Sequence, residues 1–394
     1  MKIFVPSLLA LASFMTMSAA KPIMCSGPNA RIEPPVGAIV VDPTGDPRYQ
    51  GSCRTMNEAV ARLDLTSDKL QMIFIHPGLY KEQVVIPPLC GALVLQGATC
   101  DATSYNENQV TFTHAMSQKD VPPEVKQDRN ALTSTVLFKA DNVKVYNLNI
   151  ANTAGNVGQA VAAAVSGTNY GFYGCMFTGY QDTLLTKKGL IMFANSYISG
   201  AVDFIFGTKA VAWFEHCDID SIDAGYITAN GRSSEDMDSY YVFNRANVYS
   251  SNSSLIGKTF LGRPWRLFSR VVFQNSWLGQ VVNATGWAKW QENSTDNVYF
   301  GEFNNSGPGA ATGARVNFSR QLTAAVDIKQ LLGDNYATQW WVPTGVMRRW
   351  LGAPVFVAFV SFASIQLLQA SPLFREQMVY LHGINNVHIS LAQL

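Results

Sequence analysis

The sequence predicts an all-β protein folded as a parallel β-helix solenoid, and three observations lead to that fold class. An apolar pattern recurs with a period of 21 residues, the repeats lack helical periodicity, and turn residues are frequent, with 30 Gly and 17 Pro. The 394 residues are 47% hydrophobic and 14% charged, which is ample for one large core. Lys plus Arg (29) nearly balance Asp plus Glu (28), so the composition indicates no nucleic-acid partner and no anionic membrane surface.

Each copy of the repeat has a large apolar residue, a small or apolar residue three positions later, and an apolar residue five positions later. The steps between copies are 27, 21, 21, 29 and 30 residues. The copies begin at Val145, Phe172, Phe193, Phe214, Phe243 and Phe273. We interpret each copy as one short strand per coil with these residues on its inner face, and the longer steps as loops that bulge from the coils. A β-sandwich is the alternative, but a sandwich has no reason to keep this spacing.

The first 20 residues have the pattern of a secretory signal peptide. Lys2 gives a positive start, residues 3–17 are apolar, and residues 18–20 (SAA) offer a cleavage site. The apolar run is shorter than the ~20 residues of a membrane span. We therefore expect a secreted, extracellular protein, and five N-glycosylation sequons agree with export. They are Asn252, Asn283, Asn293, Asn304 and Asn317.

Two of the six cysteines occupy the same repeat position two coils apart. These are Cys175 and Cys217. Two steps of ~4.8 Å exceed the ~7 Å between Cα atoms that a disulfide allows, so we predict two small core residues.

The remaining four cysteines could be paired in three ways. They are Cys25, Cys53, Cys90 and Cys100. An exported protein permits disulfides, and among the three pairings we favour Cys25–Cys53 with Cys90–Cys100. Neither a CxxC nor a His/Cys metal spacing occurs, which argues against a structural zinc site.

Two aspartates occupy the same position on consecutive coils, ten residues after Phe172 and Phe193. They are Asp182 and Asp203, 21 residues apart. Neighbouring strands lie ~4.8 Å apart, so the two carboxyls should face each other. Two close carboxylates do not ionise together readily, which gives a protonated acid beside an ionised base or nucleophile. The alternative, an aspartate that merely ends a strand, does not explain two residues in phase.

Five segments in order resemble the motifs of the pectinesterase (pectin methylesterase) family. They are residues 78–82 (GLYKE), 159–162 (QAVA), 179–184 (GYQDTL), 200–207 (GAVDFIFG) and 261–265 (LGRPW). The resemblance covers about residues 35–342. It implies a right-handed parallel β-helix catalytic domain, residues 21–345, that acts in the cell wall. The implied activity is that of a carboxylic ester hydrolase, which removes methyl esters from homogalacturonan and releases methanol.

The resemblance also implies the roles of the site residues. Asp203 becomes the nucleophile that forms an acyl-enzyme, and Asp182 first protonates the departing methanol and then activates water. Gln159 and Gln181 donate hydrogen bonds to the oxyanion. Arg263 holds Asp203 ionised and oriented, although a surface ion pair is the alternative for this arginine.

Two more residues are expected to bind the polysaccharide. Trp265 would pack against a galacturonate ring, with core packing as its alternative, and Thr113 would match an upstream substrate-binding threonine of the family. The resemblance implies no metal and no cofactor. The expected partner is methyl-esterified pectin, bound by a monomer that contacts neither nucleic acid nor a membrane.

The end of the chain differs from the rest. Residues 321–332 read as a short closing helix with Gly333 as its C-cap. The family resemblance stops before residues 346–394, where an 18-residue apolar run, 351–368, reaches only the lower limit for a membrane span. Arginines before this run oppose the positive-inside tendency. We interpret residues 346–394 as an extension foreign to the catalytic domain.

Three other functions fit a secreted solenoid: a pectate lyase, a polygalacturonase and a glycan-binding protein without activity. A lyase requires an acidic calcium cluster, which the sequence does not contain, and the motifs do not resemble those of polygalacturonases. Five intact catalytic positions argue against a protein that only binds.

Overall fold

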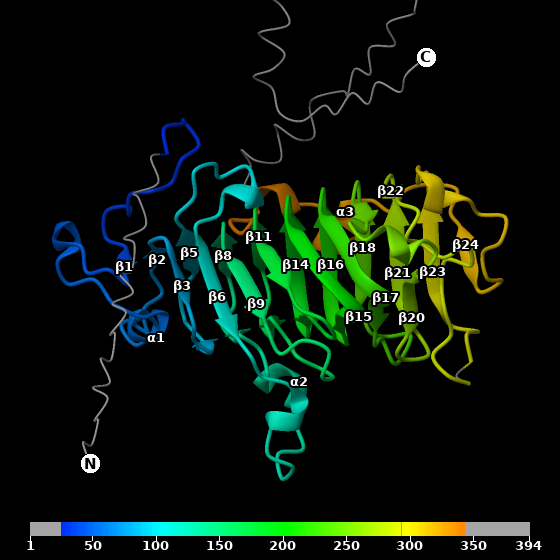
Figure 1. Ribbon diagram of the computed structural model, residues 1–394, viewed down its shortest axis with the longest axis horizontal. Coiled ribbons are helices and arrows are strands. Elements are labelled where there is room, and N and C mark those ends of the chain that lie inside the picture. Colours follow the sequence, from blue (N-terminus) through cyan, green and yellow to red (C-terminus); the bar gives the residue numbers. More distant parts are fainter. Residues whose placement is uncertain (1–24, 293, 343–394) are drawn as a thin grey trace, which may run out of the picture. The chain divides into compact units, whose positions relative to one another are not determined.

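The computed structural model describes residues 25–292 and 294–342, which form a solenoid of short parallel strands with few helices (Figure 1). The expected signal peptide at residues 1–20, the C-terminal extension at 346–394 and the sequon residue Asn293 lie outside this part. None of the described helices is long and apolar enough to cross a membrane.

One parallel sheet of 11 strands runs along the whole solenoid and carries the first residue of each repeat. Its strands, in spatial order, are β1 (Ile39–Val41), β2 (Gln71–Ile75), β5 (Leu93–Gly97), β8 (Val143–Tyr146), β11 (Tyr170–Tyr173), β14 (Lys188–Ala194), β16 (Lys209–Glu215), β18 (Tyr240–Asn244), β21 (Arg270–Gln274), β23 (Tyr299–Phe303) and β24 (Ser319–Gln321).

The other 13 strands form a second sheet with two rows, joined because β15 (Tyr197–Gly207) and β17 (Asp218–Asn230) run through both rows. The first row also contains β3 (Gly78–Tyr80), β6 (Val110–His114), β9 (Asn149–Asn152), β12 (Met176–Thr178), β19 (Asn247–Tyr249) and β22 (Trp277–Leu278). The second row also contains β4 (Val84–Ile86), β7 (Val136–Phe138), β10 (Ala163–Val165), β13 (Leu184–Thr186) and β20 (Thr259–Pro264).

The helices of the described chain are all short and lie between strands or after the last one. The α-helices are α1 (Met56–Val60), α2 (Arg129–Leu132) and α3 (Ile328–Leu332). The 3₁₀ turns are η1 (Pro47–Tyr49), η2 (Tyr105–Glu107), η3 (Gln118–Asp120), η4 (Ser253–Leu255), η5 (Pro308–Ala310) and η6 (Tyr336–Thr338).

The repeat does not lie on one strand per coil, and that part of our interpretation is wrong. Phe172 lies in β11 and Phe177 in β12, with Gly174 between them at a φ of 60°. In the next coils Asn195 and His216 occupy the same corner with φ of 48° and 49°. The left-handed residue turns the chain from one sheet to the other, so positions +3 and +5 both face the core.

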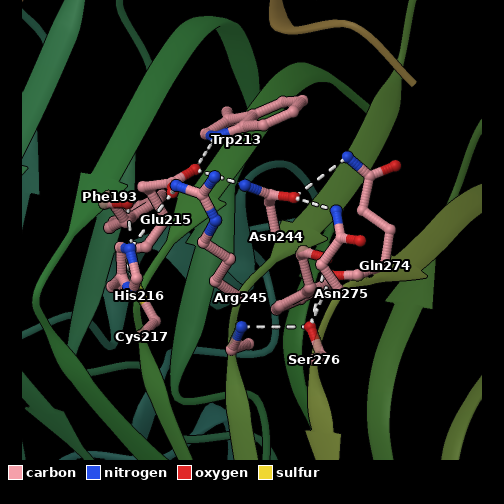
Figure 2. A network of polar contacts seen from close by, with 12 residues as sticks. Phe193, Trp213, Glu215, His216, Cys217, Asn244, Arg245, Gln274, Asn275 and Ser276 are labelled. Carbon is pink, nitrogen blue, oxygen red and sulfur yellow. Dashed lines mark hydrogen bonds and ion pairs between the residues drawn. The ribbon is translucent and has the colours of Figure 1, made fainter. Parts of the chain in front are cut away.

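A polar network covers this corner in the later coils (Figure 2). The buried Glu215 accepts hydrogen bonds from Trp213 Nε1 at 2.7 Å and Asn244 Nδ2 at 2.9 Å, and Arg245 Nη1 lies 3.4 Å from its other oxygen. Asn275 Nδ2 donates to Asn244 Oδ1 at 3.0 Å, which links one coil to the next. Charged and amide side chains thus stabilise a corner where the sequence has His and Arg in place of Asn or Gly.

Stacked aromatic rings fill the core at the start of each repeat. Phe172 and Phe193 stack with ring centroids 4.9 Å apart, Phe193 and Phe214 with centroids 4.8 Å apart. Phe243 and Phe273 continue the stack at 4.3 Å. The one-coil spacing of these rings confirms that the repeat unit is a coil of a parallel β-helix.

The predictions for Cys175 and Cys217 are confirmed, since both are free thiols with fully buried side chains. The predicted disulfides are wrong. Cys25 is bonded to Cys100, with Cα atoms 4.9 Å apart, and Cys53 and Cys90 are free.

The physical reason for the different disulfide is an N-terminal segment that folds back onto the solenoid. Arg31 forms an antiparallel bridge with Thr99, beside the disulfide. A contact over 75 residues of sequence is not visible in cysteine spacing.

The closing helix is shorter than predicted. Residues 319–321 form β24, the last strand of the long sheet, and only Ile328–Leu332 is helical. Gly333 ends the helix with a φ of 86°, as expected of a C-cap.

Among the four sequons in the described residues, Asn283 differs from the rest. Its side chain is half-buried, donates to Gly257 O at 2.8 Å and accepts from the Thr285 hydroxyl at 2.8 Å. The other three asparagines are exposed: Asn252, Asn304 and Asn317.

Candidate active site

Asp182 and Asp203 lie on neighbouring coils where the first row of the second sheet turns into the second row. Gln181 and Val202, the residues before them, form a parallel bridge, so the two aspartates are stacked. Both side chains are buried, at 5% and 4% exposure. Both residues have left-handed φ, 64° and 51°, a conformation that aspartate tolerates better than most residues and that often marks a functional site.

Asp203 is bound by a guanidinium. Arg263 donates from Nε to Oδ1 at 2.9 Å and from Nη2 to Oδ2 at 2.6 Å, a two-bond fork that fixes the carboxylate plane. The guanidinium lies between the rings of Tyr226 and Trp290, at 4.0 and 4.1 Å from their centroids. Burial raises the pKa of Asp203 above its usual value, and the bonds and charge of Arg263 offset part of that rise.

Asp182 has a different environment. Its side chain accepts a hydrogen bond from the amide of Asn130, whose Nδ2 lies 3.1 Å from Oδ2. Burial, and then the charge of Asp203, raise the pKa of Asp182 well above its usual range, while Arg263 lowers it from a greater distance. Arg263 bonds directly to Asp203 and not to Asp182, so the two carboxyls have unequal environments.

Gln159 and Gln181 lie next to each other on consecutive coils. They form a parallel bridge and are both half-buried. Within residues 25–292 and 294–342 neither side-chain amide is engaged in a hydrogen bond, whereas the backbone of Gln159 accepts from Gln118 N at 2.8 Å. Their N–H groups are therefore available to a ligand beside the aspartates.

The structure separates the two expected substrate-binding residues. Trp265 is half-buried, lies with its ring centroid 6.2 Å from Phe206, and lines a cavity of about 350 Å³ that Asn130 also lines. Thr113 lies on the outer side of β6 in another hollow of about 560 Å³, where its hydroxyl is 3.5 Å from that of Thr153. Thr113 is not among the residues that line the Trp265 cavity.

Sequence reasoning missed Asn130, which belongs to a loop between β6 and β7 that projects from the solenoid with α2 (Figure 1). Asn130 Oδ1 accepts from Gln118 Nε2 in the same loop. Arg129 fixes the loop by donating to four of its carbonyl oxygens, those of Gln118, Val121, Pro122 and Val125. An inserted loop has no repeat phase, so nothing in the spacing pointed to Asn130.

Tyr226 and Trp290 were also missed, because neither aromatic lies in a motif that we singled out. In the described part of the chain no group of three His, Cys, Asp or Glu side chains is arranged to hold a metal ion.

Comparison with known proteins gives a consistent result. The family model described as Pectinesterase matches residues 39–337. A pectinesterase of Aspergillus niger is 44% identical over 323 residues, which cover 80% of this chain and 93% of that protein. A pectinesterase of Aspergillus aculeatus is 41% identical over 348 residues, 86% of this chain and 99% of that protein.

Solved structures show the same likeness. The crystal structure of the deglycosylated pectin methylesterase from Aspergillus niger superposes with a TM-score of 0.73 at 36% identity, covering 80% of this chain and 99% of that one. Pectin methylesterase from carrot gives 0.66 at 29% identity, with 74% and 90% coverage. A pectin methylesterase in complex with a hexasaccharide gives 0.61 at 23% identity, a likeness of fold alone, covering 75% and 96%.

Proposed function

The chain belongs to the pectinesterase family and is a carboxylic ester hydrolase that removes methyl esters from pectin, and we propose that its two stacked aspartates perform the reaction. The observation that carries the proposal is the unequal environment of the pair. Asp203 is forked by Arg263, whereas Asp182 is buried without a cation bonded to it. One carboxyl is thus prepared as a nucleophile and the other as an acid.

In the first half-reaction the ionised Asp203 attacks the carbonyl carbon of a galacturonate methyl ester. The negative charge that develops on the carbonyl oxygen accepts hydrogen bonds from the amides of Gln159 and Gln181. The tetrahedral intermediate collapses when Asp182 gives its proton to the methoxy oxygen, and methanol leaves. The product is an anhydride between Asp203 and the sugar carboxyl, which is the acyl-enzyme.

In the second half-reaction Asp182, now ionised, takes a proton from water, which attacks the acyl carbon. The same amides stabilise the second tetrahedral intermediate, and its collapse releases the free galacturonate and restores the carboxylate of Asp203. Asp182 ends protonated as it began, so the cycle consumes one water and yields one methanol and one carboxylic acid.

The cavity beside the pair is proposed as part of the pectin-binding surface. Trp265 offers an aromatic face to a sugar ring at the edge of that cavity. A family member with a bound hexasaccharide supports a polysaccharide partner. Thr113 remains a proposed contact further along the chain of sugars. The signal pattern at residues 1–20 supports secretion to the cell wall.

Substitution of the nucleophile tests the reaction. Asp203→Asn should release no methanol from methylated pectin at an unchanged circular-dichroism spectrum, whereas Asp68→Asn, an exposed aspartate, should keep full activity. Methanol release by Asp203→Asn would exclude it as the nucleophile. Analysis of the sugar products identifies the alternatives, since a lyase gives unsaturated ends and a polygalacturonase gives new reducing ends.

A further inference from the structure

Another cavity, of about 580 Å³, lies on the side of the 11-stranded sheet. Tyr240 of β18, Arg270 of β21, Tyr299 of β23 and Arg320 of β24 line it. None of the residues placed in the reaction above lines this cavity. It is therefore a separate feature of the surface that the ester chemistry does not use.

The lining alternates aromatic and cationic side chains along the solenoid. Arg270 is paired with Tyr299 in the sheet register, and the register of β18 with β21 places Tyr240 on the other side of Arg270. The guanidinium of Arg270 lies 4.6 Å from the centroid of Tyr240, and that of Arg320 lies 4.6 Å from the centroid of Tyr299. Each tyrosine face thus supports one guanidinium.

These two guanidiniums lack an acidic partner. Across residues 25–292 and 294–342, neither Arg270 nor Arg320 forms an ion pair. Within the same residues Arg320 Nη2 donates to Val298 O at 3.2 Å and the Arg270 guanidinium donates to no acceptor, whereas a guanidinium has five donors. Glu235 and Asp296 also line the cavity; both are exposed and neither forms an ion pair with Arg270 or Arg320, while Glu235 accepts a hydrogen bond from Arg232 through its backbone oxygen.

A third cation, Arg232, also lines this cavity. Arg232 is buried at 7% exposure and bonds to backbone carbonyls, among them Met237 O at 2.6 Å. Burial, and then the charge of Arg270, lower the pKa of Arg232, while the charges of Glu235, Asp236 and Asp238 raise it in part. Arg232 is thus balanced by acidic neighbours, and the two arginines without an ion pair, Arg270 and Arg320, are the groups that favour an anionic ligand.

The proposed reaction itself supplies such a ligand. Each ester that is hydrolysed converts a neutral sugar into one with a carboxylate, and arginine binds carboxylates through paired N–H groups. Arg270 and Arg320 lie on strands two steps apart, about 9.6 Å at ~4.8 Å per strand, and the register sets Arg320 two residues further along its strand, so they would contact carboxylates on different sugars of one chain. We propose that this cavity binds de-esterified galacturonate and holds the enzyme on stretches that it has already processed.

This inference rests on the proposed function, and the experiment that tests it measures binding separately from turnover. Calorimetric titration would use a fully de-esterified galacturonate trimer, with the fully methyl-esterified trimer as the uncharged probe, titrated into Asp203→Asn so that its esters are not hydrolysed. The wild type should bind the de-esterified trimer at two sites, one in the catalytic groove and one in this cavity. Arg270→Gln/Arg320→Gln should lose one of them, or weaken it by at least about tenfold, the effect of a lost charge-assisted bond.

The matched control is Arg54→Gln, which removes the same charge at an exposed position near α1, at the opposite end of the solenoid from β24 (Figure 1). It should bind like the wild type. If the double variant does not fold, Arg320→Gln alone replaces it, because the Arg320 side chain is exposed. Arg270→Lys should lose less affinity than Arg270→Gln, since lysine keeps the charge. The initial rate of methanol release should be unchanged in all of them.

Two binding sites retained in the double variant, an equal loss in Arg54→Gln, or equally tight binding of the methylated trimer at the cavity would overturn the inference. A wild-type protein that releases no methanol would overturn the proposed function instead, while the calorimetric result would still be readable.

Discussion

The pair formed by Arg263 and Asp203 gives the most informative perturbation. Arg263→Gln removes two charge-assisted bonds of 2.9 and 2.6 Å and leaves a buried carboxyl with no cation. The glutamine amide can still donate one hydrogen bond, so the net loss is one charge-assisted bond of about 1.5–3 kcal/mol, and 1.36 kcal/mol corresponds to one pKa unit. The pKa of Asp203, already raised by burial, should therefore rise by a further 1–2 units, roughly.

The assay is the initial rate of methanol release from a short methylated oligogalacturonate between pH 4 and 9. Because only ionised Asp203 attacks, the acidic limb of the kcat/KM profile should move up by about 1–2 units. Below that limb the variant should be slower by about 10–100-fold, and the difference should shrink as the pH rises. Arg263→Lys keeps the charge but not the fork, and should show a smaller displacement.

The same substitution predicts a pH-dependent loss of stability. A carboxyl whose folded pKa lies above its unfolded pKa binds more protons in the folded state, so the free energy of unfolding falls as the pH rises between the two pKa values. Arg263→Gln raises the folded-state pKa of Asp203, so the pH range over which stability is lost extends to higher pH. Its Tm deficit should be largest at neutral pH and should shrink as the pH falls. An acidic limb that stays in place while kcat falls would refute the reasoning, because Arg263 would then not govern the ionisation of Asp203.

Three further predictions follow from the described residues. Gln181→Ala should lower kcat by about 10²–10³-fold with little change in KM, and an unchanged kcat would remove Gln181 from the oxyanion site. Asn130→Ala should raise the pKa of Asp182 further and move the alkaline limb of the kcat profile upward by up to about 1 unit, while Asn106→Ala, on an exposed turn, should move neither limb. Non-reducing peptide mapping should link Cys25 to Cys100, and Cys100→Ser should cost about 2–4 kcal/mol of unfolding free energy; a peptide that links Cys90 instead would contradict the fold of the N-terminal segment.

The features that repeat could be predicted from the sequence. Phe172, Phe193 and Phe214 stack as their spacing indicates, and the aspartates that follow the first two of them lie in register on neighbouring coils. What spacing could not reveal was the geometry within one period. The left-handed corner residue, with a φ of 60° at Gly174, divides the repeat between two sheets, and a pattern of apolar residues does not distinguish a corner from a longer strand.

Features outside the repeat could not be predicted for a different reason. Asn130 reaches Asp182 from an inserted loop, and Cys25 reaches Cys100 by folding back across 75 residues. Both contacts depend on how one irregular segment packs on the solenoid. The fork from Arg263 to Asp203 spans 60 residues, and it was expected only through the family resemblance, because no charge spacing in the sequence connects the two.

The most direct test of the account is to identify the residue that becomes acylated. Rapid quenching of the wild-type protein with a short methylated oligogalacturonate, followed by proteolysis and mass spectrometry, should place the sugar on the peptide that contains Asp203. Asp203→Asn should carry no adduct and release no methanol. An adduct on the peptide that contains Asp182, or methanol release by Asp203→Asn, would contradict the division of roles that Arg263 imposes on the pair.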